Sequence, residues 1–115
     1  MVDKLIRDGH VAVLHTSWHG AGWSTWAEPH EKLTLLFEPD VADVVMRYRG
    51  QKYFDEIKML EEIRLLFAVK AYESYQQGAS HLAITWIPQG TQFRIREHDG
   101  MEIIDLKDSI DWISA

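Results

Sequence analysis

The pattern of apolar and polar residues predicts a strand near the start of the chain. Residues Val11 to Ser17 form a short β-branched and apolar run with glycines on both sides, which is typical of a mostly buried strand between turns. Before this run, three apolar residues with helical spacing predict a single helical turn: Val2, Leu5 and Ile6.

The middle of the chain has the 3.6-residue period of helices. Apolar residues at i, i+3, i+4 and i+7 between Val41 and Tyr48 predict an amphipathic helix. Asp40 is a suitable N-cap residue. Gly50 can adopt the left-handed conformation that ends a helix.

A second helix is predicted from about Lys52 to Gln77, followed by Gly78 as its stop. Because Leu65 to Val69 is apolar on every side of the helix, we expect that stretch to be buried on more than one side. At 1.5 Å per residue the helix would be about 39 Å long. A domain of this size is narrower than that, so we expect a break near Met59 to Glu62.

After Ser80 the period changes to two, which predicts a strand that ends at Pro88. A two-residue turn at Asp99 and Gly100 then predicts a hairpin over Gln92 to Leu106. In that register, apolar residues share one face and an opposite charge pair lies on the other: Phe93 opposite Leu106, Ile95 opposite Ile104, and Arg94 opposite Asp105.

The order of these elements predicts an α+β fold, formed as a single small domain over residues 1–115. We expect a four-stranded mixed or antiparallel sheet with two main helices inserted after strand one. The helical connection is long enough for a right-handed crossover, which would make the first two strands parallel. The short segment Ile110 to Ile113 is expected to cover an edge.

Composition narrows the class of protein. The 115 residues fit one domain. The 12 basic and 18 acidic residues give a net charge of -6, which disfavours nonspecific binding to nucleic acid.

The chain has no cysteine, so disulfides, thiol nucleophiles and cysteine zinc sites are excluded and a cytoplasmic location is expected. No export signal or membrane anchor is recognisable, so no membrane partner is expected.

Residues 15–30 are the candidate site, because this stretch combines indoles, glycines, histidines and hydroxyls without a sustained period. Glycines let the backbone take positive φ and approach a ligand, indoles provide flat apolar surfaces, and successive N–H groups can form an anion nest. The alternative is that Trp23 and Trp26 fix a long loop onto the core and that the glycines only make the turn. The candidate binding residues are Trp18, Gly20, Gly22, Trp23, Ser24, Thr25 and Trp26.

Several catalytic motifs are excluded for this stretch. It has no lysine for a phosphate-binding loop of the nucleotide-hydrolase type. A nucleophile elbow needs glycine where Trp26 stands, so Ser24 is a poor nucleophile. We therefore expect no catalytic residue and no cofactor.

Histidines offer one further kind of site. A zinc or other divalent ion could be held by nitrogen and oxygen ligands from this stretch. Its candidates are His15, His19 and His30, with Glu28 as a fourth ligand.

Two segments carry a resemblance. VAVLHTSWHGAGWSTW (residues 11–26) and WIPQGTQFRI (residues 86–95), with EHDG after it, resemble small uncharacterised proteins encoded by tailed bacteriophages and prophages. Those proteins carry a GAGWSTW loop, a WxPxGxxFxI strand pair and a following DG turn. The resemblance implies a phage accessory role in the host cytoplasm, without a mechanism.

We therefore predict a non-enzymatic binding protein that uses the tryptophan-rich loop to contact a host protein. Two alternatives stay open. One is a protein that sequesters a small, anionic, nucleotide-like ligand, with the site at the interface of a homo-oligomer. The other is a hydrolase with a histidine-bound metal.

Overall fold

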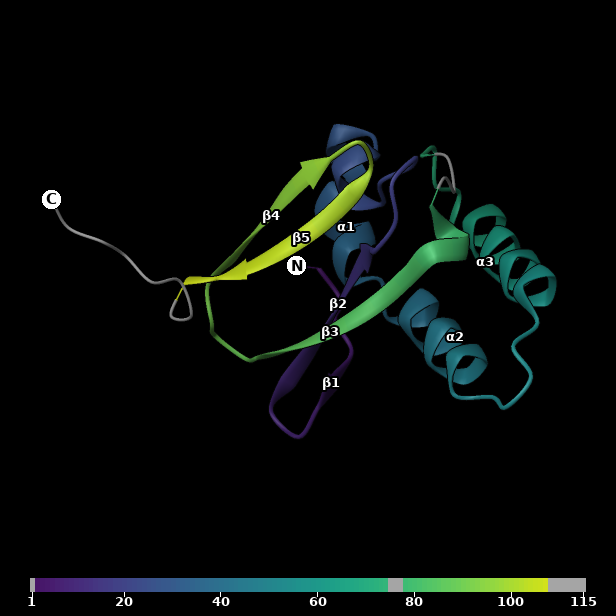
Figure 1. Cartoon of the computed structure of the whole chain (residues 1–115), viewed down its shortest axis with the longest axis horizontal. Coiled ribbons are helices and arrows are strands. Elements are labelled where there is room, and N and C mark those ends of the chain that lie inside the picture. Colours follow the sequence, from purple (N-terminus) through teal and green to yellow (C-terminus); the bar gives the residue numbers. More distant parts are fainter. Residues whose placement is uncertain (1, 75–77, 108–115) are drawn as a thin grey trace, which may run out of the picture.

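The chain folds around a three-stranded antiparallel sheet with the order β1–β2–β3 (Figure 1). In the computed structural model, which describes residues 2–74 and 78–107, the strands are β1 (Ile6–Arg7), β2 (His10–Thr16) and β3 (Leu82–Pro88). The predicted first strand is thus confirmed as β2, displaced by one residue. The predicted segment Ile110 to Ile113 lies outside the described residues.

The start of the chain is extended, so the predicted helical turn is wrong. Asp8 and Gly9 both have positive φ, 51° and 74°, and form a two-residue turn that returns the chain from β1 into β2. Ile6 pairs with Val11 across this turn. Hairpin pairing to a buried strand therefore outweighs the helical spacing of the apolar residues.

The pairing of β2 with β3 is antiparallel, so the predicted crossover is wrong. Leu82, the first residue of β3, lies opposite Thr16, the last residue of β2. The helical segment between them therefore returns the chain to the end of the sheet that it left. A crossover would have returned it to the opposite end.

The predicted hairpin is confirmed, but it forms a sheet of its own. Strands β4 (Phe93–His98) and β5 (Met101–Leu106) pair in the predicted register. Asp99 and Gly100 have φ of 50° and 91°, as a primed turn requires. Because β4 pairs only with β5 among the described residues, the predicted four-stranded sheet is replaced by sheets of three and two strands.

The described chain has three α-helices rather than the two main helices predicted: α1 (Lys32–Phe37), α2 (Pro39–Arg49) and α3 (Glu56–Lys70). The carboxylate of Glu38, not Asp40, caps α2 by accepting hydrogen bonds from the N–H groups of Asp40 and Val41. Gly50 follows α2 with a φ of -82°, so it does not take the left-handed conformation.

Helix α3 is shorter than predicted and unbroken. It ends where Ala71 adopts a left-handed φ of 57°, so no kink is needed to fit it within the domain. Gly78 also has a positive φ, but it precedes a short 3₁₀ turn that leads into β3. Leu65 and Val69 are 65% and 81% exposed, so the prediction that this stretch is buried on more than one side is wrong.

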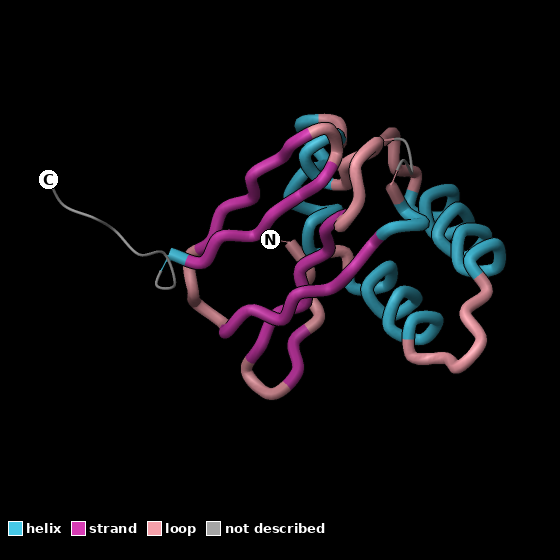
Figure 2. The backbone as a smooth tube through the Cα atoms, in the orientation of Figure 1, coloured by secondary structure: helices cyan, strands magenta, loops and turns pink. Residues whose placement is uncertain are grey.

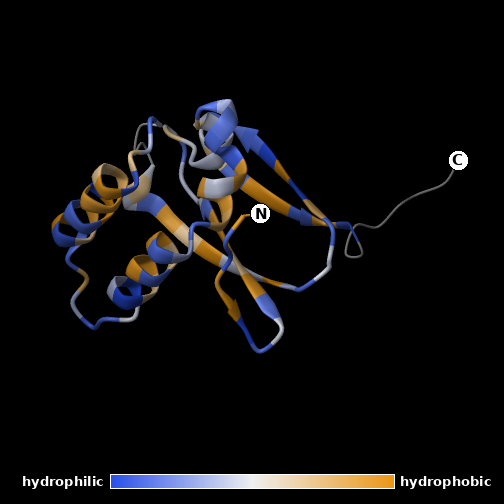
Figure 3. Cartoon of the chain, turned by 180° about the vertical axis from the view of Figure 1, so that it is seen from behind, coloured by the Kyte–Doolittle hydropathy of each residue, from blue (hydrophilic) through white to orange (hydrophobic). Residues whose placement is uncertain are grey.

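Two apolar clusters hold the sheets and helices together. Figure 3 shows apolar residues, in orange, along these strands and helices. Alternate residues of β2 point to opposite faces of the sheet. One set, including Ala12 and Leu14, packs against α2 and α3. The other set, including Val11 and Val13, packs with α1 and with the inner face of the β4–β5 hairpin. The helices α2 and α3 and the hairpin therefore lie at opposite ends of the molecule (Figure 1).

Candidate functional site

The tryptophan loop, residues 17–27, connects β2 to the helical segment and runs beside the β4–β5 turn (Figure 2). Its three indoles have different environments. Trp18 and Trp26 are 62% and 46% exposed, whereas Trp23 is 3% exposed. The candidate binding residues therefore divide into an exposed group and a buried one.

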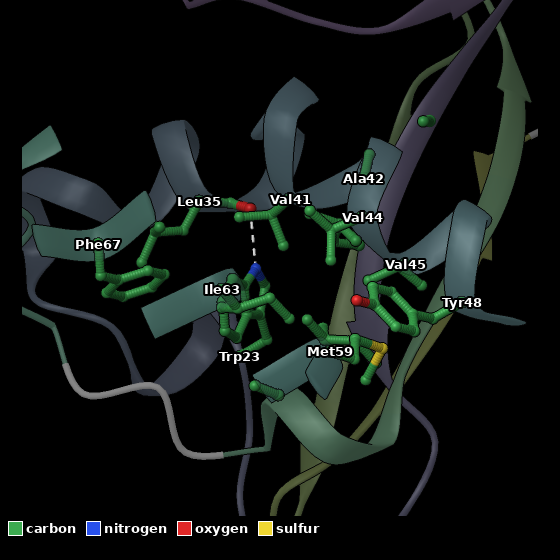
Figure 4. Packing of buried hydrophobic residues seen from close by; sticks show 14 of the residues in the cluster. Trp23, Leu35, Val41, Ala42, Val44, Val45, Tyr48, Met59, Ile63 and Phe67 are labelled. Carbon is green, nitrogen blue, oxygen red and sulfur yellow. Dashed lines mark hydrogen bonds between the residues drawn. The ribbon is translucent and has the colours of Figure 1, made fainter. Parts of the chain in front are cut away.

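Trp23 belongs to the core. Its indole N–H donates a hydrogen bond to the backbone carbonyl of Leu35 over 2.8 Å (Figure 4). Its ring meets the ring of Phe67 edge to face, with 5.6 Å between centroids. For this residue the alternative in which an indole fixes the loop onto the core is correct.

The buried carboxylate of Glu102 on β5 holds the backbone of the loop. One oxygen accepts the N–H of Thr16 at 3.0 Å. The other oxygen accepts the N–H of Trp23 at 2.9 Å, the N–H of Thr25 at 3.0 Å and the hydroxyl of Thr25. Glu102 is only 3% exposed, so these charge-assisted hydrogen bonds form away from water, where they are strong.

These contacts occupy the backbone N–H groups that were predicted to form an anion nest. The loop does present backbone N–H groups to a negative charge, but the charge is a carboxylate of the same chain. Gly20 likewise donates its N–H to the carbonyl of Asp99. The N–H groups of Gly20, Trp23 and Thr25 are therefore engaged within the fold.

The two loop glycines serve different purposes. Gly20 has a φ of 120°, a backbone conformation that side chains disfavour. Gly22 has no positive φ, so that part of the prediction is wrong. A Cβ on Gly22 would lie 2.7 Å from the ring of Trp26, so this glycine makes room for the indole that covers it.

The exposed rings rest on polar neighbours. Trp18 stacks on His81 with 5.7 Å between ring centroids. Trp26 donates its indole N–H to the carboxylate of Glu97 at 2.9 Å. That hydrogen bond, together with one from the N–H of Gly100, lowers the pKa of Glu97 below its ordinary value. Each ring is held by a neighbour while much of the residue stays exposed to solvent.

The remaining candidates of the loop are less accessible. Ser24 is 5% exposed and opens a short 3₁₀ turn, Ser24–Trp26. Thr25 directs its hydroxyl to Glu102. Both residues therefore support the shape of the loop.

The three candidate metal ligands lie in separate places. The ring of His15 bonds to Thr85 on β3, His19 lies against His98 of the hairpin, and His30 lies 3.5 Å from Glu73. Within residues 2–74 and 78–107, no three histidine or carboxylate side chains gather as a metal site would require. The metal site that the sequence suggested for His15, His19 and His30 is therefore not formed among the described residues.

A cleft of about 540 Å³ lies between β5 and the face of β2 and β3. Its lining combines β5, including the carboxylates Glu102 and Asp105, with His15, Ser17 and Thr85. The Nε2 atom of His15 lies 2.8 Å from the hydroxyl of Thr85, while its Nδ1 atom is buried without a hydrogen-bond partner among the described residues. Burial lowers the pKa of His15 below the ordinary 6.5, although the charge of Glu102 partly offsets this.

Acidification should therefore destabilise the fold through His15. The folded chain favours the neutral imidazole, and the unfolded chain gains a proton near pH 6.5. The contribution of the neutral His15 imidazole to the free energy of unfolding is therefore complete above that pH and is lost as the pH falls below it. Urea unfolding at about pH 7.5 and about pH 5.5 should show a smaller pH effect for His15→Gln than for the wild-type chain. An NMR titration midpoint for His15 at or above 6.5 would contradict this expectation.

Two further buried carboxylates were not identified from the sequence. Glu31 accepts hydrogen bonds from the N–H groups of Glu73 and Ser74 and from the hydroxyl of Ser74. Although burial raises the pKa of Glu31, these hydrogen bonds lower it overall. Glu38, besides capping α2, accepts the hydroxyl of Tyr72. Both groups fasten the segment after α3 to the helices, which is a structural role.

The comparisons with known proteins supply no family for this site. No protein-family model, curated protein or solved structure matches the chain. In the described part of the chain, no helix combines the length and the apolar character needed to cross a membrane.

Proposed function

We propose that the protein is a non-enzymatic, phage-encoded accessory factor that binds a host protein through Trp18 and Trp26. One observation carries the proposal: two indoles are exposed on a loop whose backbone is fixed by a buried carboxylate. Exposed tryptophans are costly in a free protein and are enriched among residues that dominate binding energy. The phage setting is supported by the GAGWSTW and WxPxGxxFxI motifs alone.

The fixed backbone favours a protein partner over a small anion. A binding loop that is already ordered loses less conformational entropy when it meets a partner. The hydrogen bonds to Glu102 supply that order. A phosphate at the loop would need backbone N–H groups, and those of Trp23 and Thr25 are engaged with Glu102.

Removing either exposed indole should weaken binding without unfolding the chain. Immobilised wild-type protein should retain a host protein from bacterial lysate that the Trp18→Ala/Trp26→Ala variant does not retain. Trp18→Ala and Trp26→Ala are then titrated separately with that purified partner. Whichever of the two binds more weakly should lose about 30-fold in affinity, because interface tryptophans contribute about 2 kcal/mol or more. Both single variants should keep their unfolding free energy within about 1 kcal/mol of wild type.

Tyr53→Ala is the matched control, since Tyr53 is an aromatic residue that is 81% exposed and lies outside the tryptophan loop. This variant should retain the same partner with unchanged affinity. Equal retention by the wild type and the double tryptophan variant would show that the loop is not the binding surface.

A further inference from the structure

The outer side of α3 carries large apolar side chains that the described fold leaves uncovered. Ile57, Leu65 and Val69 are 71%, 65% and 81% exposed. Their spacing of eight and four residues places them on one side of the helix. The residues of α3 that are buried, Met59 and Ile63 among them, lie on the opposite side.

Three exposed charged residues accompany this apolar side: Glu61, Arg64 and Lys58, which lies seven residues before Leu65. Glu61 and Arg64 lie one turn apart on α3 and are both exposed. Neither forms an ion pair with another described residue. A hollow of about 350 Å³ is lined by these two residues together with Leu65 and Ala68. A second hollow of about 330 Å³, between α2 and α3, also includes Leu65.

We propose that this side of α3 binds the same side of α3 in a second copy of the chain, as an antiparallel helix pair about a two-fold axis. In such a contact every pairing occurs twice. Glu61 of each copy then faces Arg64 of the other, and Ile57 of each copy lies near Ala68 and Val69 of the other. A parallel pair would set Glu61 against Glu61, which is repulsive.

The pairing of Glu61 with Arg64 favours a second copy over a partner of uniform charge. A uniformly acidic or basic partner would leave one of the two charges facing a like charge. In a second copy, Glu61 and Arg64 are complementary to each other across the two-fold axis, so both charges meet an opposite charge. The pairing also accounts for the apolar stretch Leu65 to Val69, whose outer residues a single copy leaves exposed. The surface lies on α3 and is independent of Trp18 and Trp26.

Sedimentation velocity over about a thousandfold range of concentration should show a reversible dimer. Leu65→Glu should weaken the dimer by about tenfold or more, because a charge then replaces an apolar contact at its centre. Leu33→Glu is the matched control, since Leu33 on α1 is 62% exposed and lies outside the proposed contact. It should leave the dimer unchanged.

Charge reversal tests the antiparallel arrangement directly. Arg64→Glu and Glu61→Arg should each weaken the dimer by about tenfold, and the double variant should recover affinity to within about threefold of wild type. Circular dichroism of each variant checks that α3 still forms. A monomer at every concentration, a dimer that Leu65→Glu leaves intact, or a double variant that does not recover would overturn the proposal.

Discussion

Replacing Glu102 by alanine should lower the free energy of unfolding by about 4 kcal/mol. The substitution leaves the buried N–H groups of Thr16 and Trp23 and the partly buried N–H of Thr25 without an acceptor, and each buried group costs about 1–3 kcal/mol. Glu102→Gln should cost less, about 2 kcal/mol, because one oxygen remains while the new amide nitrogen faces N–H donors. Urea unfolding followed by far-UV circular dichroism measures both effects.

Glu73→Gln is the control for the Glu102 variants, because it makes the same chemical change on a side chain that is 71% exposed. It should alter stability by no more than about 0.5 kcal/mol. If Glu102→Ala proves as mild as this control, the carboxylate does not organise the tryptophan loop. Trp26 and Trp18 would then lack the ordered backbone on which the proposed binding depends.

Gly100→Ala should destabilise the chain by about 3 kcal/mol or more. A left-handed backbone costs a residue with a Cβ about 1–2 kcal/mol. In addition, a Cβ at this position would lie 2.3 Å from the backbone nitrogen of Ala21, and a backbone atom cannot turn aside as a flexible side chain can. Forcing atoms into such a contact costs about 1–3 kcal/mol further.

Gly90→Ala separates these two contributions. Gly90 has a φ of 90°, almost equal to the 91° of Gly100, but a Cβ there meets nothing within 4 Å. Gly90→Ala should therefore cost only the conformational part, about 1–2 kcal/mol. If the two variants lose similar free energies of unfolding in urea, Gly100 is not in close contact with the backbone of Ala21 in the tryptophan loop.

The sequence predicts most reliably those elements whose signals are local. The hairpin register follows from Asp99, Gly100 and the alternation on either side of them. The same Asp–Gly pair occurs at Asp8 and Gly9, where it also makes a turn. The turn at Asp8 and Gly9 is thus a stronger local signal than the helical spacing of the few apolar residues before it.

Elements that depend on distant contacts could not be predicted in this way. Helix α1 has six residues, too few for a periodic pattern, and the carbonyl of its Leu35 accepts the hydrogen bond from Trp23. The direction of β3 relative to β2 is set by where the three helices return the chain. No local pattern in β3 specifies that direction.

The candidate site was predicted in part. The tryptophan-rich loop was found from its composition, but its lack of period gave no indication of which ring is buried. Trp23 is buried because Leu35 and Phe67 lie beside it, and both come from later elements. Glu102 could have been found: in the predicted hairpin it shares a face with Ile104 and Leu106, and a carboxylate on an inward face needs hydrogen-bond donors.

The antiparallel pairing of β2 with β3 also bears on how the chain folds during synthesis. The hairpin β4–β5 is local and can close within about 1–10 μs. Strand β2 lacks its main partner until Leu82 to Pro88 has left the ribosome, and pairings of such large sequence separation form slowly. The nascent chain therefore carries the apolar run Val11 to Leu14 without its β3 partner while some seventy later residues are translated, which makes it a natural binding segment for chaperones.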